Sequence, residues 1–194
     1  MLELRDGDAL IVVDVQNDFL PGGSLAVPHG GEVVPILNRY IAEFHARRLP
    51  VVATRDWHPA NHISFKARGG PWPPHCVPGT RGAEFAPGLR LPADAPIVSK
   101  AATPDDDSYS GFQGTDLAAR LKRQNITRLF IGGLATDYCV LVTVKDAISN
   151  GFEVVLLQDA IRAVNVAPDD GAKAEAEMRR LGAQPATLAD IRSR

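Results

Sequence analysis

The chain has 194 residues, of which 45% are hydrophobic and 23% are charged, a size and composition that favour one domain with a sizeable core. Its formal net charge of -2 argues against nucleic acid or an anionic membrane surface as a partner. The apolar stretches are far shorter than a membrane span, and the first residues lack the basic and apolar regions of a signal peptide. We therefore expect a cytoplasmic protein that acts on a small molecule.

Short, nearly continuous apolar runs recur along the chain, as is typical of strands covered on both faces of a parallel sheet. They occupy residues 9–14, 49–54, 95–100, 128–132 and 153–157. Apolar residues at helical spacing lie in segments 31–48, 115–124, 138–150 and 168–181. This alternation predicts an α/β fold of three layers, with a doubly wound, mostly parallel sheet and helices on both faces.

Residues 56–96 interrupt this alternation, because they are rich in Pro and Gly and show no periodicity. Such a long stretch inside a compact domain is usually a functional loop or a disordered one. Its three histidines and two tryptophans argue for function, since disordered segments are poor in aromatic residues. We expect a single domain over residues 1–194, with a metal-binding loop inserted at about 56–96.

Four reactive positions fall at or just past the C-terminal ends of predicted strands. They are Asp14, Asp56, Lys100 and the segment that leads to Cys139. Ligands of open α/β sheets bind beyond the carboxyl ends of the strands. The sequence therefore predicts that these side chains converge on one crevice.

Cys139 follows a predicted strand that ends in glycines, at the point where a helix should begin. With Asp137 or Thr136 as N-cap, Cys139 would lie in the first helical turn, where free N–H groups and the helix dipole favour a thiolate. We interpret Cys139 as a nucleophile; the alternative is a small buried hydrophobic residue. Cys76 lacks this context, which indicates a buried inert residue or a soft metal ligand.

Asp14 and Lys100 end apolar strands, where a charge is costly unless it is paired or catalytic. If both meet Cys139, Asp14 can take the thiol proton while Lys100 stabilises the thiolate. The alternative is a structural ion pair between Asp14 and Lys100, and charge spacing alone does not separate the two interpretations.

The inserted loop carries a candidate metal site. Asp56 and His58 are two residues apart, so on an extended segment their side chains share a side, and His75 follows as a third ligand. One carboxylate and two imidazoles suit one divalent metal ion, Zn²⁺ first, with Fe²⁺ or Mn²⁺ as alternatives. His62 would be a fourth ligand or a group behind the ligands. The competing interpretation is that these histidines are simply solvated.

Aromatic residues near these positions could enclose a flat ring. The candidates are Phe19, Trp72 and Tyr109, since small-molecule pockets are lined mainly by apolar and aromatic side chains. Taken singly, each could equally be an ordinary packing residue.

The segments that carry these residues resemble the nicotinamidases, also called pyrazinamidases, within the isochorismatase-like cysteine hydrolases. The resemblance extends over nearly the whole chain, through residues 11–19, 54–59, 72–80 and 132–140 and through Lys100. The first and last of these segments specify the cysteine hydrolase. The Asp/His/His set is more specific, because metal-free relatives lack it.

The resemblance implies a catalytic triad of Asp14, Lys100 and Cys139. It also implies a cis peptide bond preceding Ala135 and an oxyanion hole formed by the backbone N–H groups of Ala135 and Cys139. Ala135 would also contact the substrate. Such preorganised donors can contribute roughly 3–4 kcal/mol to transition-state stabilisation.

The resemblance further implies a metal held by Asp56, His58 and His75. The implied reaction is the hydrolysis of nicotinamide to nicotinate and ammonia through a thioester on Cys139, as a step of NAD salvage. The competing hypotheses are an amidohydrolase of the same family that acts on another small amide or carbamoyl compound, and a non-catalytic binding protein that keeps the fold. The sequence leaves the subunit number open, a homo-oligomer included.

Overall fold

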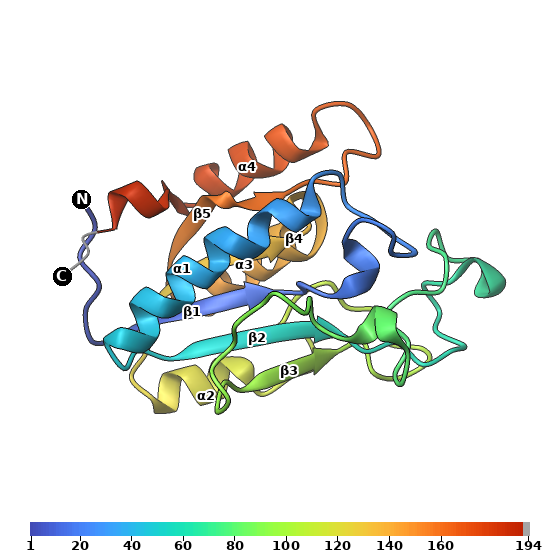
Figure 1. Ribbon diagram of the computed structural model, residues 1–194, viewed down its shortest axis with the longest axis horizontal. Coiled ribbons are helices and arrows are strands. Elements are labelled where there is room, and N and C mark those ends of the chain that lie inside the picture. The colour runs from blue at the N-terminus through green and yellow to red at the C-terminus, as the bar shows by residue number, and fades with distance from the viewer. Residues whose placement is uncertain (192–194) are drawn as a thin grey trace.

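The computed structural model describes residues 1–191, in which six parallel strands form one sheet (Figure 1). The strands are β1 (Asp8–Val13), β2 (Val51–Asp56), β3 (Ile97–Lys100), β4 (Arg128–Leu134), β5 (Glu153–Arg162) and β6 (Gln184–Ala186). The helices are α1 (Val33–Ala46), α2 (Leu117–Arg123), α3 (Leu141–Ser149) and α4 (Asp170–Arg180). The predicted α/β class is confirmed.

Two apolar layers enclose the sheet. Leu10 and Val12 of β1 belong to the same core as α1, whereas Ile11 and Val13 belong to the core that contains residues of α2, α3 and α4. Every residue of β1 is buried, which explains why its sequence is continuously apolar instead of alternating. Within residues 1–191, no helix combines the length and the apolar character needed to cross a membrane.

The strand order β3-β2-β1-β4-β5-β6 reverses direction at β1. From β1 the chain first builds outward through β2 and β3, and it then returns to add β4 on the other side of β1. Such a reversal opens a crevice at the carboxyl ends of the two central strands, where α/β proteins bind ligands. Asp14 follows β1 there, and residues 135–139 follow β4. Much of segment 57–96 loops beyond the arrowheads of β2 and β3 (Figure 1).

The structure differs from the sequence prediction mainly at the ends of elements. Strand β5 continues to Arg162, five residues beyond the predicted end, and the short edge strand β6 was not predicted. Its sequence, Gln-Pro-Ala, contains a proline, which is tolerated on an edge strand but gives no strand signal. Residues 136–140 form a π-helical turn before α3, where the start of a regular helix was expected.

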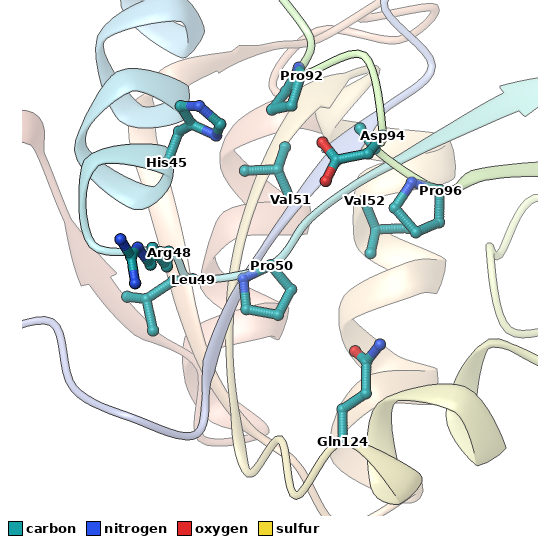
Figure 2. Close-up of a pocket in the computed structure, with 11 residues that line it drawn as sticks. His45, Arg48, Leu49, Pro50, Val51, Val52, Pro92, Asp94, Pro96 and Gln124 are labelled. Atoms are coloured by element: carbon teal, nitrogen blue, oxygen red, sulfur yellow. The ribbon is translucent and has the colours of Figure 1, made fainter.

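A hollow of about 350 Å³ lies at the opposite end of the sheet, beside the start of β2 (Figure 2). Its lining includes His45, Arg48, Asp94 and Gln124. None of the predicted site residues lines it. The hollow is therefore separate from the crevice at the carboxyl ends of the strands.

Gly133 allows the backbone of β4 to lie close to that of β1. Its φ is +129°, and a Cβ atom built on it would lie 2.1 Å from the carbonyl oxygen of Val13. A side chain at this position would therefore push apart the two strands that carry Asp14 and the segment before Cys139.

We expect Gly133→Ala to lower the free energy of unfolding by roughly 3 kcal/mol or more, since it combines backbone strain with a clash against main-chain atoms. Gly151→Ala is the matched control, because Gly151 also has a positive φ of +87° but has open space around its Cα, and it should cost about 1 kcal/mol. Urea denaturation of both variants measures the difference. Equal losses would show that the β1–β4 approach is not the constraint.

Candidate active site

Asp14 lies directly after β1 and is fully buried. The hydroxyl group of Thr54 donates a hydrogen bond of 2.6 Å to its Oδ1 atom. The backbone of Asp14 has a φ of +49°, a conformation that strains a residue other than glycine and is found preferentially at functional positions. Thr54 and the end of β1 thus hold one carboxylate in a fixed orientation.

Lys100, the last residue of β3, brings the predicted triad together. Its Nζ atom lies 2.9 Å from Asp14 Oδ2 and 3.4 Å from Cys139 Sγ, and it also contacts Asp56 Oδ1. The ammonium group is entirely buried. The three side chains therefore lie together, and Asp56, which was expected in the same crevice, is an additional partner of Lys100.

Burial shifts the pKa values of the side chains in this cluster. Burial raises the pKa of the Cys139 thiol well above its ordinary value, although the Lys100 charge opposes the effect. Burial also raises the pKa of Asp14 against the attraction of Lys100. Burial alone would lower the pKa of Lys100, but Asp14 and Asp56 outweigh it and the pKa is raised. The charge of Lys100 is therefore the attraction that opposes the cost of burying Asp14 and Cys139.

The segment before Cys139 differs from the predicted helix start. Residues 136–140 form a π-helical turn in which Val140 N–H donates to Ala135 O at 3.1 Å, and neither Thr136 nor Asp137 acts as a side-chain cap. Asp137 instead accepts hydrogen bonds from the backbone of residues 164 and 165. The N-cap prediction was thus wrong. π-Turns inside helices often occur at functional sites.

The peptide bond between Leu134 and Ala135 is cis, as the resemblance implied. Cys139 is only 5% exposed, yet together with Ala135 it borders a pocket that is also lined by Phe19 and Trp72. The sulfur is thus sheltered from bulk solvent but adjacent to the space that a ligand would enter.

Asp56, His58 and His75 form a compact donor cluster, with their ligand atoms within 4.8 Å of one another. Asp56 Oδ2 lies 3.4 Å from His58 Nε2 and 3.9 Å from His75 Nε2. All three residues are buried, so the alternative of solvated loop histidines is excluded.

The hydrogen bonds behind these histidines suit metal binding. His58 Nδ1 faces Ala101 O at 3.3 Å, and His75 Nδ1 faces Pro73 O at 2.8 Å. A carbonyl oxygen only accepts, so the Nδ1 atom of each ring is the donor to it, and the Nε2 atom of each ring is the one that faces Asp56 Oδ2. Fixing the tautomer from behind is the usual arrangement for metal-ligating histidines, and the donor set fits a divalent metal ion.

A second cluster of potential metal ligands lies nearby, but its members already contact Lys100. Asp14, Asp56 and Cys139 also have ligand atoms within 4.8 Å of one another. The Nζ atom of Lys100 contacts all three, so a cation already occupies the centre of this group. The candidate metal position is therefore on the histidine side of Asp56.

His62 packs behind the donor cluster instead of joining it. Its ring stacks on His58 with centroids 4.2 Å apart, and its two nitrogen atoms are hydrogen-bonded to Ser64 Oγ and Asp106 O. Cys76 is fully buried and lies outside the donor clusters of the described residues. Burial raises the pKa of the Cys76 thiol, as suits an inert residue.

A mostly apolar pocket opens over the cysteine and the donor cluster. It is lined by Phe19, Leu25, Val27, Asp56, Trp72, His75, Tyr109, Ala135, Tyr138, Cys139 and Val164. Trp72 Nε1 donates a 3.0 Å hydrogen bond to the hydroxyl group of Tyr109. The rings of Trp72 and Tyr138 pack edge to face, with their centroids 5.1 Å apart. All four expected substrate-contacting residues line this pocket.

Sequence reasoning missed four of the lining residues. The position of Tyr138 beside Cys139 could have identified it, because neighbours of a nucleophile often face the ligand. Leu25, Val27 and Val164 carry no such signal, since they are apolar residues in loops that only the tertiary structure brings to the crevice.

Comparison with known proteins gives the family. The Isochorismatase domain matches residues 8–190. The nicotinamidase of Escherichia coli (strain K12) is 42% identical over an alignment of 203 residues that covers 94% of this chain and 95% of that protein.

Two solved structures match closely. The zinc complex of the pyrazinamidase of Pyrococcus horikoshii has 51% identity and a TM-score of 0.90 and covers 94% of this chain and 99% of that chain. A protein from L. infantum in complex with nicotinate has 39% identity and a TM-score of 0.89, with 96% of each chain covered. Together with the fold and the buried Asp14, Lys100 and Cys139 cluster, these matches show that the chain belongs to the isochorismatase family.

Proposed function

We propose that this protein is a nicotinamidase that hydrolyses nicotinamide to nicotinate and ammonia in NAD salvage and that also accepts pyrazinamide. The observation that carries the proposal is the pocket itself. The Cys139 thiol lies at its edge beside Asp14 and Lys100, aromatic side chains surround the space, and the Asp/His/His cluster borders it. The similar proteins support the same activity, since they are named as a nicotinamidase and a pyrazinamidase and one was solved in complex with nicotinate.

In the proposed reaction, Asp14 removes the thiol proton as Cys139 Sγ attacks the carboxamide carbon. The backbone N–H groups of Ala135 and Cys139 donate to the oxyanion that forms. The protonated Asp14 then returns its proton to the departing nitrogen, so that ammonia leaves and a thioester remains. Asp14 next accepts a proton from water as that water attacks the thioester. It then returns this proton to the departing sulfur, which restores the thiol, and the released carboxylic acid loses its proton to solvent as nicotinate.

In this mechanism, Lys100 stabilises negative charge on Asp14 and on Cys139. Its buried ammonium lies within reach of both Asp14 and Cys139. Negative charge passes between the carboxylate and the sulfur during the attack, and a fixed cation beside both atoms stabilises it in either position. The cluster therefore needs no histidine as a general base.

Asp56, His58 and His75 would hold one divalent metal ion, with zinc as first choice and Fe²⁺ or Mn²⁺ as alternatives. When bound, the ion would supply a Lewis acid that can attract the ring nitrogen of the substrate. We further propose that residues 1–194 act as one domain, with segment 56–96 as the metal-binding insertion. Two unpaired cysteines suit a reducing cytoplasm.

The direct test of this proposal is ammonia release from nicotinamide and from pyrazinamide, measured on the zinc-loaded protein before and after chelation. We expect turnover of both amides and its loss after chelation, with recovery when zinc is restored. Turnover of other small amides, with no turnover of these two, would assign the protein to a different amidohydrolase activity.

Replacement of the nucleophile tests the catalytic assignment. Cys139→Ala should lower kcat by a factor of 10³ or more, on the order of the effect of removing other catalytic nucleophiles, while circular dichroism shows an unchanged fold. Cys76→Ala is the matched control, because that cysteine is also buried but does not line the pocket. Comparable activity in Cys139→Ala and Cys76→Ala would remove Cys139 from the mechanism.

Loss of a proposed ligand tests the metal site. His58→Ala should lower the bound zinc measured by elemental analysis, since it removes one of three protein ligands. His45→Ala, at the distant hollow near the start of β2, should leave the zinc content unchanged. Stoichiometric zinc in His58→Ala would contradict the ligand assignment.

A further inference from the structure

The side chain of Gln16 is fully buried. It forms hydrogen bonds with both the backbone N–H group and the backbone C=O group of Asp56. Gln16 Oε1 accepts a hydrogen bond of 2.8 Å from Asp56 N–H, and Gln16 Nε2 donates one of 2.8 Å to Asp56 O. The same Nε2 donates to Ala83 O at 3.0 Å. The amide group thus uses both amide protons and its oxygen on two segments of chain.

The sheet itself leaves these Asp56 groups without strand partners. Strand β1 pairs with β2 as far as Thr54, and the chain leaves the sheet direction at Asp14, whose φ is +49°. On the other side, β3 pairs with β2 up to Lys100. The N–H and C=O groups of Asp56 on the β1 side would therefore remain buried and unpaired, a costly state. The Gln16 amide takes the place of the missing strand.

The orientation of Asp56 matters because its two carboxylate oxygens face different groups. Oδ1 contacts Lys100, whereas Oδ2 faces His58 and His75 at 3.4 Å and 3.9 Å. A small rotation of the Asp56 backbone would turn Oδ2 away from the two imidazoles. Groups that orient a ligand from behind typically change metal affinity 10–100-fold when they are removed.

We infer that Gln16 is a positioning residue for the metal site, which fixes the Asp56 carboxylate toward His58 and His75 by hydrogen-bonding its backbone. The inference rests on the proposed function, since it requires the Asp56, His58 and His75 cluster to bind a metal ion. Gln16 does not line the pocket, so its effect passes through Asp56.

Asn17 offers a control that distinguishes the positioning of Asp56 from general stabilisation of the fold. The side chain of Asn17 donates a hydrogen bond of 2.8 Å to Arg81 O, in the same short turn, 81–83, that Gln16 contacts through Ala83. No hydrogen bond of the Asn17 side chain reaches Asp56 among the described residues. Asn17→Ala therefore removes a contact to this turn while it leaves the Asp56 backbone held.

The experiment compares zinc affinity, by competition with a chromogenic chelator, in the wild type, Gln16→Met and Asn17→Ala. Gln16→Met keeps the length of the side chain and removes its hydrogen bonds, and we expect its zinc dissociation constant to rise 10–100-fold. We also expect the visible spectrum of its Co²⁺-loaded form to differ from that of the wild type, because the ligand geometry changes. Asn17→Ala should match the wild type in both measurements.

Gln16→Asn provides the same test if Gln16→Met does not fold, because it keeps a polar group that is too short to reach both Asp56 atoms. Circular dichroism of the metal-free proteins checks the fold of each variant. Wild-type zinc affinity and an unchanged cobalt spectrum in a folded Gln16 variant would overturn the inference alone. A wild-type protein that binds no zinc would instead overturn the metal site of the proposed function, and the inference with it.

Discussion

One buried ammonium group organises this crevice. Lys100 Nζ contacts Asp14, Asp56 and the sulfur of Cys139, and solvent reaches none of the side-chain charge. Removing one partner from a buried ion pair costs about 3–5 kcal/mol, because the remaining charge is left uncompensated. Each carboxylate therefore depends on the lysine, and the lysine depends on both. The positions of Cys139 and of the Asp56 carboxylate, which we propose as nucleophile and metal ligand, thus depend on the same charge.

The sheet topology makes this meeting possible. Asp14, Asp56 and Lys100 come from the ends of three adjacent parallel strands, and Cys139 follows the strand on the other side of β1. Gly133 permits β1 and β4 to approach closely enough for the two halves of the crevice to face each other. The candidate reactive groups thus lie at or just beyond the ends of the strands, while loop residues such as Leu25, Val27 and Trp72 line other parts of the pocket.

The strands and the candidate site were predictable because both follow from local patterns. Apolar runs mark buried strands, and charged residues at their ends, such as Asp14 and Lys100, are costly without a purpose. The remaining features depend on three-dimensional neighbours. Strand β6 is short and contains a proline, Asp137 binds the distant residues 164 and 165, and Gln16 looks like any polar residue until its partner Asp56 is known. No periodicity encodes such pairings.

The aromatic residues that line the pocket come from other segments than the Asp14, Lys100 and Cys139 cluster. Trp72 comes from the long insertion and Tyr109 from the segment after β3, and a hydrogen bond of 3.0 Å joins these two lining residues. Neither residue touches Lys100 through a hydrogen bond or ion pair among the described residues. Substitutions at Trp72 and Tyr109 could therefore change which amide substrate is accepted during evolution, without disturbing Asp14, Lys100 and Cys139.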